Sequence, residues 1–209
     1  MEALFQRNLR KVNGMKNFIK TSIVLAAAIA LVGSNAAAQV RGVVGVGLSV
    51  PVGDFADATG GDAEAGGGTA LAGLEWMPAG RSFGLRVDGA YNRFCTSACD
   101  QAGGDLDVRY RFLNANLNGL IEFPMGTDAR LRPYLLAGVG FYNYKLEGDD
   151  VPTGVGDSES DFGVNGGLGI NYALGRVGLF AEGRFHNVFA TGSDLQYVPV
   201  MIGARINLQ

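Results

Sequence analysis

The chain has 209 residues, of which 47% are hydrophobic, 18% are charged and 33 are glycine. This composition is too apolar for a disordered protein and far richer in glycine than the usual share of about 7%. The formal net charge of −3 is uneven: residues 1–38 hold five basic residues and one acidic residue, which leaves twelve basic and nineteen acidic residues in 39–209. An acidic body argues against nucleic acid as a partner.

The basic start of the chain has the pattern of an export signal. From Met15, "MKNFIK" is a positive segment, "SIVLAAAIALV" is an apolar segment, and "SNAAAQ" is a small-residue cleavage sequence. The apolar run is shorter than the roughly 20 residues of a membrane-spanning helix, which disfavours an anchor. We expect residues 15–38 to be a signal peptide cleaved after Ala38 and residues 39–209 to be the mature domain. Residues 1–14 would be an N-terminal extension that a mis-assigned start codon explains.

After Ala38, apolar and polar residues alternate in runs bounded by Gly, Pro, Asp and Ser clusters, and no long segment has the helical period. Alternation of this kind is typical of β-strands. Most runs reach the length of about 9–11 residues that a membrane-spanning strand needs, against five or six for a usual strand. Eight runs follow one another: Val40–Val50, Gly68–Met77, Phe83–Phe94, Leu106–Phe123, Leu131–Leu146, Phe162–Leu174, Val177–Phe189 and Gln196–Leu208.

The connections between these runs alternate between long and short. The long ones are Pro51–Gly67, Cys95–Asp105, Glu147–Asp161 and Ala190–Leu195, and the short ones are Pro78–Ser82, Pro124–Arg130 and Gly175–Arg176. Short periplasmic turns and longer extracellular loops are the rule in membrane barrels of the outer-membrane type. A soluble barrel does not need this rule, and apolar residues would line its interior.

Aromatic residues lie near both ends of the runs, as the two interfaces of a bilayer favour. Trp76, Phe83, Phe123 and Tyr172 are close to the short turns, and Tyr91, Phe141 and Phe162 are close to the other ends. Soluble sheets also have aromatic residues at strand ends, so this pattern supports the membrane interpretation without deciding it.

The last but one run, Val177–Phe189, indicates which face meets lipid. Because strand residues two apart share a face, Leu179 and Phe185 lie on one side and Glu182 on the other. A barrel of eight strands has a bore that side chains can fill, and charges buried there must be paired. We therefore expect an ion-pair and amide network that plugs the lumen. Alternation assigns these charged or titratable side chains to it: Arg41, Glu75, Arg86, Asp88, Glu122, Arg132, Glu182, Arg184, His186 and Arg205.

The fourth run changes phase along its length. Tyr110 and Phe112 are apolar at even positions, whereas Leu117 and Ile121 are apolar at odd positions. A β-bulge near Phe112–Leu113 would reconcile the two halves. The pattern then predicts that the second half crosses the membrane and that the first half projects beyond it.

Three segments carry a resemblance to a known family: "RPYLLAGVGFYNY" (Arg132–Tyr144), "LFAEGRFHNV" (Leu179–Val188) and "YVPVMIGARINL" (Tyr197–Leu208). With the signal peptide, they resemble the small outer-membrane β-barrel family that includes the OmpA-like transmembrane domain and OmpX-type proteins. The resemblance implies an all-β fold, an eight-stranded antiparallel up-and-down transmembrane β-barrel with short periplasmic turns and longer extracellular loops. It also implies the outer membrane of a Gram-negative-type bacterium as location.

The same resemblance implies the partners of the chain. They would be outer-membrane lipids and lipopolysaccharide, together with the outer-membrane assembly machinery and periplasmic chaperones. We expect a monomer and no nucleic acid.

Two loops hold residues suited to cross-linking or metal binding. Cys95 and Cys99 would be exported to an oxidising compartment, which favours a disulfide between them, and two cysteines alone make no zinc site. Glu147–Asp161 has six acidic residues in fifteen. Their oxygens suit Ca²⁺, but the spacing matches no EF-hand, and an acidic solvated loop is the commoner explanation. We expect the disulfide, and no metal or cofactor.

Catalysis would need a base, and His186 is the one histidine of the chain. Some similar barrels are enzymes that act on lipid A, and the deacylase-like pattern has a serine two residues after the base, where this chain has Val188. A nucleophile beside its base is therefore missing from that spacing. We predict no enzyme, but a structural or interaction protein that acts through its extracellular loops. A narrow pore or carrier of small apolar solutes is the alternative, ahead of a lipid A-modifying enzyme.

Overall fold

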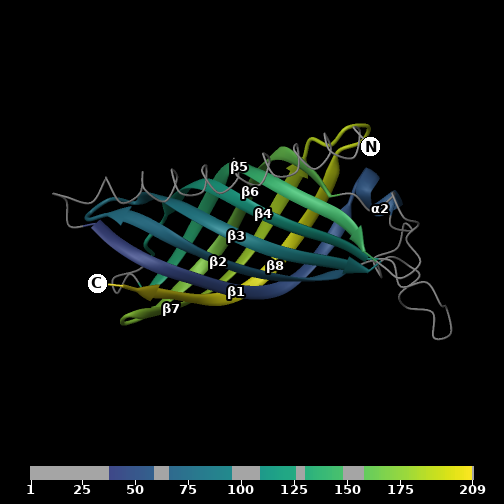
Figure 1. Cartoon of the computed structure of the whole chain (residues 1–209). Helices are drawn as coiled ribbons and strands as arrows, with labels where there is room; N and C mark the ends of the chain where they lie inside the picture. Colours follow the sequence, from purple (N-terminus) through teal and green to yellow (C-terminus); the bar gives the residue numbers. More distant parts are fainter. Residues whose placement is uncertain (1–37, 59–65, 96–108, 126–129, 148–157, 209) are drawn as a thin grey trace, which may run out of the picture. The chain divides into compact units, whose positions relative to one another are not determined.

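The computed structural model describes residues 38–58, 66–95, 109–125, 130–147 and 158–208 (Figure 1). The chain divides into Met1–Ala38 and Gln39–Gln209. The second unit is a closed antiparallel barrel in which each strand pairs with its neighbours in the sequence and β1 pairs with β8. The elements are β1 (Ala38–Val52), α2 (Asp54–Ala58), β2 (Gly67–Pro78), β3 (Phe83–Cys95), β4 (Arg109–Glu122), β5 (Leu131–Glu147), β6 (Glu159–Leu174), β7 (Val177–Val188) and β8 (Leu195–Asn207).

All eight predicted strands are present, and their ends differ from the prediction by three residues at most. The alternating connections are confirmed as well. The tightest, between β6 and β7, is Gly175–Arg176, where Gly175 has a φ of 69°. Two-residue hairpin turns that match the strand twist need such positive φ values, which glycine adopts without strain. The short helix α2, in the first long connection, was not predicted.

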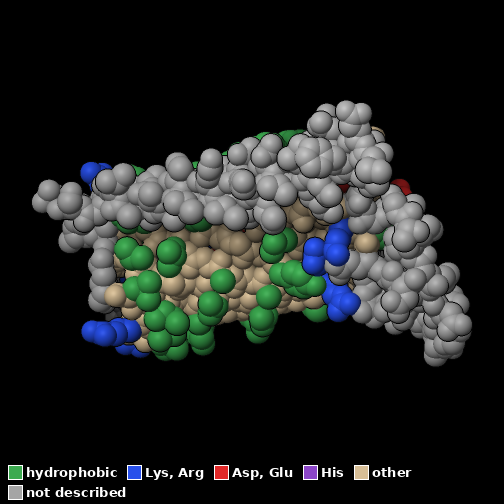
Figure 2. All heavy atoms as spheres, viewed as in Figure 1, with side chains coloured by type: hydrophobic (Ala, Val, Ile, Leu, Met, Phe, Trp, Pro, Cys, Tyr) green, Lys and Arg blue, Asp and Glu red, His purple; other side chains and the backbone are tan. Residues whose placement is uncertain are grey.

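The barrel is apolar outside and polar inside. Large apolar side chains on its outer surface are strongly exposed, such as Leu48 (70%), Ile202 (67%) and Phe162 (69%). Figure 2 shows hydrophobic side chains scattered over the outer face of the strands, with Lys and Arg side chains at both ends. An exterior of this kind is stable against lipid, because lipid removes the exposed apolar area from water. Within the described part of the chain, no helix has the length and hydropathy to cross a membrane.

The predicted β-bulge in the fourth strand is wrong. Pairing of β4 runs without a break from Phe83↔Ile121 to Cys95↔Arg109 on one side, and the pairing with β5 is equally regular. Phe112 is therefore on the inner face, where it is fully buried. The prediction failed because it assumed that apolar residues of a membrane strand face lipid. Near the long-loop end of this barrel, the interior is itself apolar.

Candidate functional site

Two groups of side chains are buried on the inner face of the barrel. The ionic network consists of Arg41, Glu75, Arg86, Asp88, Glu122, Glu182, Arg184 and Arg205, all of them buried. The aromatic cluster consists of Phe55, Phe94, Phe112, Tyr142, Val188 and Tyr197, which form one buried cluster. Apart from Phe55, which lies on α2, both groups arise from the same strand geometry, because every second residue of each strand points inward.

Glu182 on β7 links two arginines across the barrel. Its Oε2 accepts a hydrogen bond of 2.6 Å from Arg86 Nη1 of β3, and its Oε1 accepts one of 2.6 Å from Arg184 Nη2. Tyr134 of β5 donates its hydroxyl to Oε2 at 2.8 Å. Arg86 also donates its Nε to Glu75 Oε1 of β2 at 2.8 Å. The Glu182 carboxylate thus connects side chains from three strands. Its hydrogen bonds to the arginines are short and charge-assisted, and bonds of this kind are stronger than those between neutral groups.

Asp88 is the second acidic centre of the network. Arg184 Nη1 lies 3.0 Å from Asp88 Oδ1 and 3.1 Å from Oδ2. Asn116 and Asn118 of β4 donate their amides to the same carboxylate at 2.8 Å and 3.0 Å. Asp88 thus combines an ion pair with amide hydrogen bonds, and the amides come from the strand next to it.

Glu122, at the end of β4 nearer the short turns, organises the rest of the network. Its Oε1 accepts hydrogen bonds from Arg41 Nη1 at 2.7 Å and from Arg205 Nη1 at 2.8 Å. Arg205 Nη2 also lies 3.3 Å from Glu75 Oε1, which joins this group to the Arg86 group. Arg132 is more peripheral: its Nη1 is 3.9 Å from Glu122 Oε2 and its side chain is 32% exposed.

The ionic network is electrically balanced, with four carboxylates and four guanidinium groups. Balance matters because an unpaired charge in a low-dielectric interior costs several kcal/mol. Replacing such a network by apolar residues can be neutral or stabilising, whereas removing one member leaves an opposite charge unpaired. The arrangement therefore acts as one unit.

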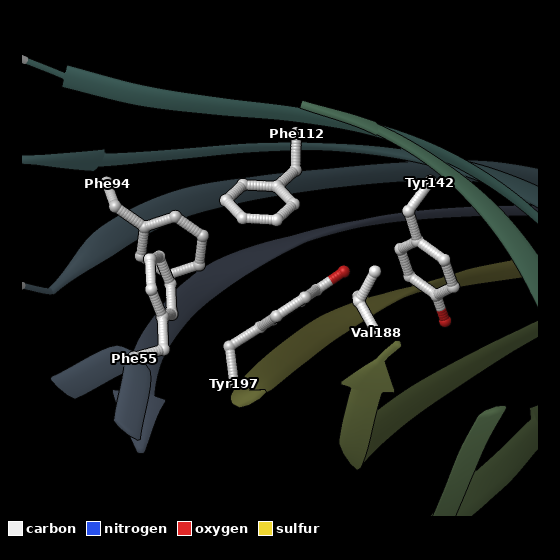
Figure 3. Packing of buried hydrophobic residues seen from close by; sticks show 6 residues of the cluster. All are labelled: Phe55, Phe94, Phe112, Tyr142, Val188 and Tyr197. Carbon is white, nitrogen blue, oxygen red and sulfur yellow. The ribbon is translucent and has the colours of Figure 1, made fainter. Parts of the chain in front are cut away.

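Figure 3 shows the six residues of the aromatic cluster. The cluster lies toward the long-loop end of the barrel, since Phe94 and Val188 are at the ends of β3 and β7 that lead into long connections. Phe55 of α2 packs edge-on against Phe94 and Phe112, with ring centroids 5.4 Å and 5.5 Å apart. Tyr197 packs against the same two rings at 5.5 Å. Edge-to-face contacts at this separation are favourable beyond the area they bury. These rings form an apolar layer across the bore.

Phe55 was missed by sequence reasoning, although it is only 1% exposed. It belongs to none of the eight alternating runs and stands in "GDFADA", a stretch of acidic and small residues. The signal that could have found it is an isolated large aromatic residue in a loop of small and acidic residues. In the structure, α2 points this ring inward, where it meets Phe94, Phe112 and Tyr110.

His186 lies beside the aromatic cluster rather than within the ion pairs. Its Nδ1 and the hydroxyl of Tyr142 are hydrogen-bonded at 2.8 Å, and its ring stacks on Tyr197 with centroids 4.6 Å apart and an interplanar angle of 2°. The side chain is 2% exposed. Its polar contact in the described part of the chain is the hydroxyl of Tyr142, and a phenol is protonated, and therefore a poor nucleophile, at neutral pH.

Three predictions fall on residues outside the described part. Cys99 and the side chain of Cys95 lie outside it, as do the predicted signal peptide before Ala38 and the greater part of Glu147–Asp161. The disulfide and the cleavage site stay predictions. Among the described residues, no group of three or more His, Cys, Asp or Glu side chains could hold a metal ion.

Comparisons with known proteins agree with this geometry. The family model described as "Outer membrane protein beta-barrel domain" matches residues 23–185. Comparison with curated protein sequences found no match.

Several solved structures share the fold. Neisserial surface protein A (NspA) superposes with a TM-score of 0.56 at 14% identity, over 84% of this chain and all of that one. A major outer membrane protein from Thermus thermophilus gives 0.51 at 14% identity, over 81% and 99% of the two chains. Ail of Yersinia pestis, an attachment invasion locus protein solved with the heparin analogue sucrose octasulfate, gives 0.50 at 13% identity, over 80% and 99%. At these identities the likeness concerns the fold alone.

Proposed function

The chain belongs to the outer membrane protein β-barrel family, and from this premise we propose that it is a closed, non-conducting barrel that displays its extracellular loops as an anionic interaction surface. The observation that carries the proposal is the filling of the lumen at two levels, by the ionic network and by the aromatic cluster. A barrel of eight strands leaves a bore that side chains fill, so the exterior is where it can contact other molecules.

The charge of the connections supports an anionic surface. The long connections 53–66, 96–108, 148–158 and 189–194 contain four, three, three and one acidic residues, and none contains Lys or Arg. The short connections 79–82, 123–130 and 175–176 contain three arginines and one aspartate. An excess of one sign on a surface attracts partners of the opposite sign and repels those of the same sign. The proposed partner is therefore a cationic protein segment or peptide.

A narrow pore or a carrier of small apolar solutes would require a path through both layers of the lumen. Such a path would have to displace Phe55 or its ring neighbours and then separate Glu182 from Arg86. Breaking a buried pair is costly, as the unpaired charges would have to be solvated. A lipid A-modifying enzyme is disfavoured because His186, the one histidine, is buried against Tyr142 and Tyr197.

Single-channel recording in planar bilayers tests the closed lumen. The refolded mature barrel should give no resolved conductance steps, and vesicles that contain it should not swell in solutions of small solutes. Regular conductance steps from the unmodified protein would contradict the proposal and favour the pore.

The anionic surface has a separate test. Binding of a fluorescent polylysine to the barrel in vesicles should be strong and salt-dependent, and sucrose octasulfate should not bind. Asp149→Asn, Asp150→Asn and Asp157→Asn together should weaken polylysine binding, whereas Asp128→Asn in a short connection is the matched control. Binding of sucrose octasulfate without binding of polylysine would overturn the assigned sign of the surface.

A further inference from the structure

The inner face of β5 and β6 carries an aromatic ring and two carboxylates at the long-loop end. Tyr144 lies on the same face of β5 as the buried Tyr142. Glu159 and Asp161 lie on the same face of β6 as the buried Gly163, because strand residues two apart point the same way. Glu159 is exposed, so this face continues from the filled lumen into water. We call Tyr144, Glu159 and Asp161 the inner rim.

One hydroxyl group connects the two carboxylates of the inner rim. Tyr144 is paired in register with Glu159, and its hydroxyl lies 2.9 Å from Glu159 Oε2 and 2.8 Å from Asp161 Oδ2. A hydroxyl has one hydrogen, so it donates to one carboxylate at a time. Two like charges are thus brought together around a single hydrogen. A cation with several N–H groups would satisfy both carboxylates at once.

The Tyr144 ring is the apolar side of the inner rim. It stacks on Phe112 with ring centroids 5.5 Å apart and an interplanar angle of 25°, so the aromatic cluster fixes its position. The residue is half-buried, and the face of a tyrosine ring attracts a cation within about 6 Å of its centroid. A fixed ring beside two carboxylates is complementary to a guanidinium group, which stacks on rings and donates paired N–H groups to carboxylates.

At this end of the barrel, cations and carboxylates lie on opposite faces of the strands. Arg93, Arg111 and Lys145 form one row in register across β3, β4 and β5. All three occupy outer-face positions, since each is next to an inward-facing residue of its strand. The side-chain oxygens of the inner rim have the Tyr144 hydroxyl, rather than a cation, as hydrogen-bond partner in the described part of the chain. The inner rim is therefore anionic, and a complementary partner must supply the cation.

The carboxylates of the inner rim stand beyond the end of β7. Pairing of β6 with β7 begins at Gly163↔Val188, whereas its pairing with β5 continues to Tyr144↔Glu159. Residues 159–161 of β6 therefore have β5 on one side and extend past β7 on the other. Strand β7 does not flank these carboxylates, which leaves them on the part of the barrel that meets the outside solution.

We propose that the inner rim is a binding site for an arginine side chain of the partner, an inference that deepens the anionic surface proposed above and rests on it. The guanidinium group lies against the Tyr144 ring and donates N–H groups to Glu159 and Asp161. Lysine fits this site less well, because its ammonium group is a compact point charge without a planar fork of donors. The barrel therefore prefers arginine-rich to lysine-rich segments of equal charge.

Fluorescence anisotropy with labelled hexa-arginine and hexalysine tests the site at equal peptide charge. The mature barrel in phosphatidylcholine vesicles should bind hexa-arginine about two- to fivefold more tightly, the effect of a cation–π contact at an exposed site. Vesicles without protein give the background. Tyr144→Leu should reduce hexa-arginine binding to the level of hexalysine and leave hexalysine binding unchanged. Glu159→Gln together with Asp161→Asn should weaken the binding of hexa-arginine more than that of hexalysine.

The matched control for the carboxylates is Asp54→Asn with Asp57→Asn, which removes two exposed charges from α2 and should weaken both peptides equally. Tyr91→Leu removes a ring from the outer face and should change neither. Heat-dependent mobility on gels verifies that each variant is folded.

Two outcomes would overturn the arginine site and leave the anionic surface in place. One is equal binding of the two peptides by the unmodified barrel, and the other is an undiminished preference for hexa-arginine in Tyr144→Leu. Binding of neither peptide would overturn the anionic surface itself, and the arginine site with it.

Discussion

The ionic network and the aromatic cluster fill the same bore by opposite means. The network pairs four carboxylates with four guanidinium groups, so each member depends on a partner of opposite charge. The cluster packs rings at centroid distances of 5.4–5.6 Å around Phe94, and each ring depends on shape. A narrow lumen therefore need not be polar along its whole length. It must only leave no unpaired charge and no large void.

The two regions also differ in where their side chains originate. Every member of the ionic network is on a strand, whereas the aromatic cluster takes Phe55 from α2 in a connection. The backbone of each strand is hydrogen-bonded to a neighbouring strand on both sides. The backbone of the short helix α2 has no such neighbouring strands to hold it in place. Loss of one member of the network should therefore destabilise the barrel more than loss of one ring of the cluster. Of the four predictions below, Glu182→Ala and Phe55→Ala compare the two regions directly.

The largest effect is expected for Glu182→Ala. Loss of this carboxylate leaves Arg86 and Arg184 without their shared partner, and breaking a buried pair typically costs about 3–5 kcal/mol. Urea unfolding in lipid vesicles, followed by the fluorescence of the single tryptophan, Trp76, gives the change in free energy. Glu159→Ala, at an exposed position at the long-loop end of β6, is the control and should change it little. A cost below that of Phe55→Ala would invert the ranking of the two regions.

Leu179→Arg tests the direction of the strand that carries Glu182. Leu179 is 52% exposed on the outer face of β7, and an arginine facing lipid near the bilayer midplane costs about 2–4 kcal/mol. The variant should fold in a smaller fraction of molecules, measured by heat-dependent gel mobility, and Leu179→Met should fold normally. If the arginine variant folded as well as the methionine variant, this face would not be in contact with lipid.

Phe55→Ala measures what the loop helix adds to the aromatic cluster. Removing this fully buried ring should cost about 1.5–3 kcal/mol, the transfer free energy of a large apolar side chain. Asp57→Ala, exposed on the same helix, should cost much less in the same unfolding assay. The variant should still not conduct in planar bilayers, because the ionic network beneath it is intact. Conductance steps in this variant would assign closure to the aromatic cluster alone.

The smallest effect is expected for Tyr142→Phe. The change removes the hydroxyl that is hydrogen-bonded to His186 Nδ1 at 2.8 Å and keeps the ring in the cluster. A net hydrogen bond contributes about 0.5–1.5 kcal/mol, and Tyr91→Phe on the outer face is the matched control. A loss larger than that of Phe55→Ala would mean that the polar pair, rather than ring packing, stabilises this layer.

In the residues of the ionic network, charge and strand alternation coincide, so the sequence assigns them to the inner face. Glu182 and Arg184 are two residues apart in a strand, so they must share a face, and no lipid-facing strand tolerates both. The partners across the barrel were left open, since Arg86, Arg132 and Arg205 all satisfied the alternation. The structure selects Arg86 for Glu182 and assigns Arg205 to Glu122. Such choices depend on strand register and on the width of the bore.

The number of strands, the inner and outer faces of most of them, and the alternation of long and short connections can be predicted from the sequence, because they follow from a two-residue period and from turn residues. The aromatic cluster depends on how the closed barrel brings distant residues together. An apolar residue such as Phe112 is stable against lipid and in an apolar lumen alike, so the alternation of apolar residues does not show whether its side chain points outward or inward. Only the closed barrel, with its unbroken register and with Phe55 brought over the bore by α2, gives that ring neighbours on the inside.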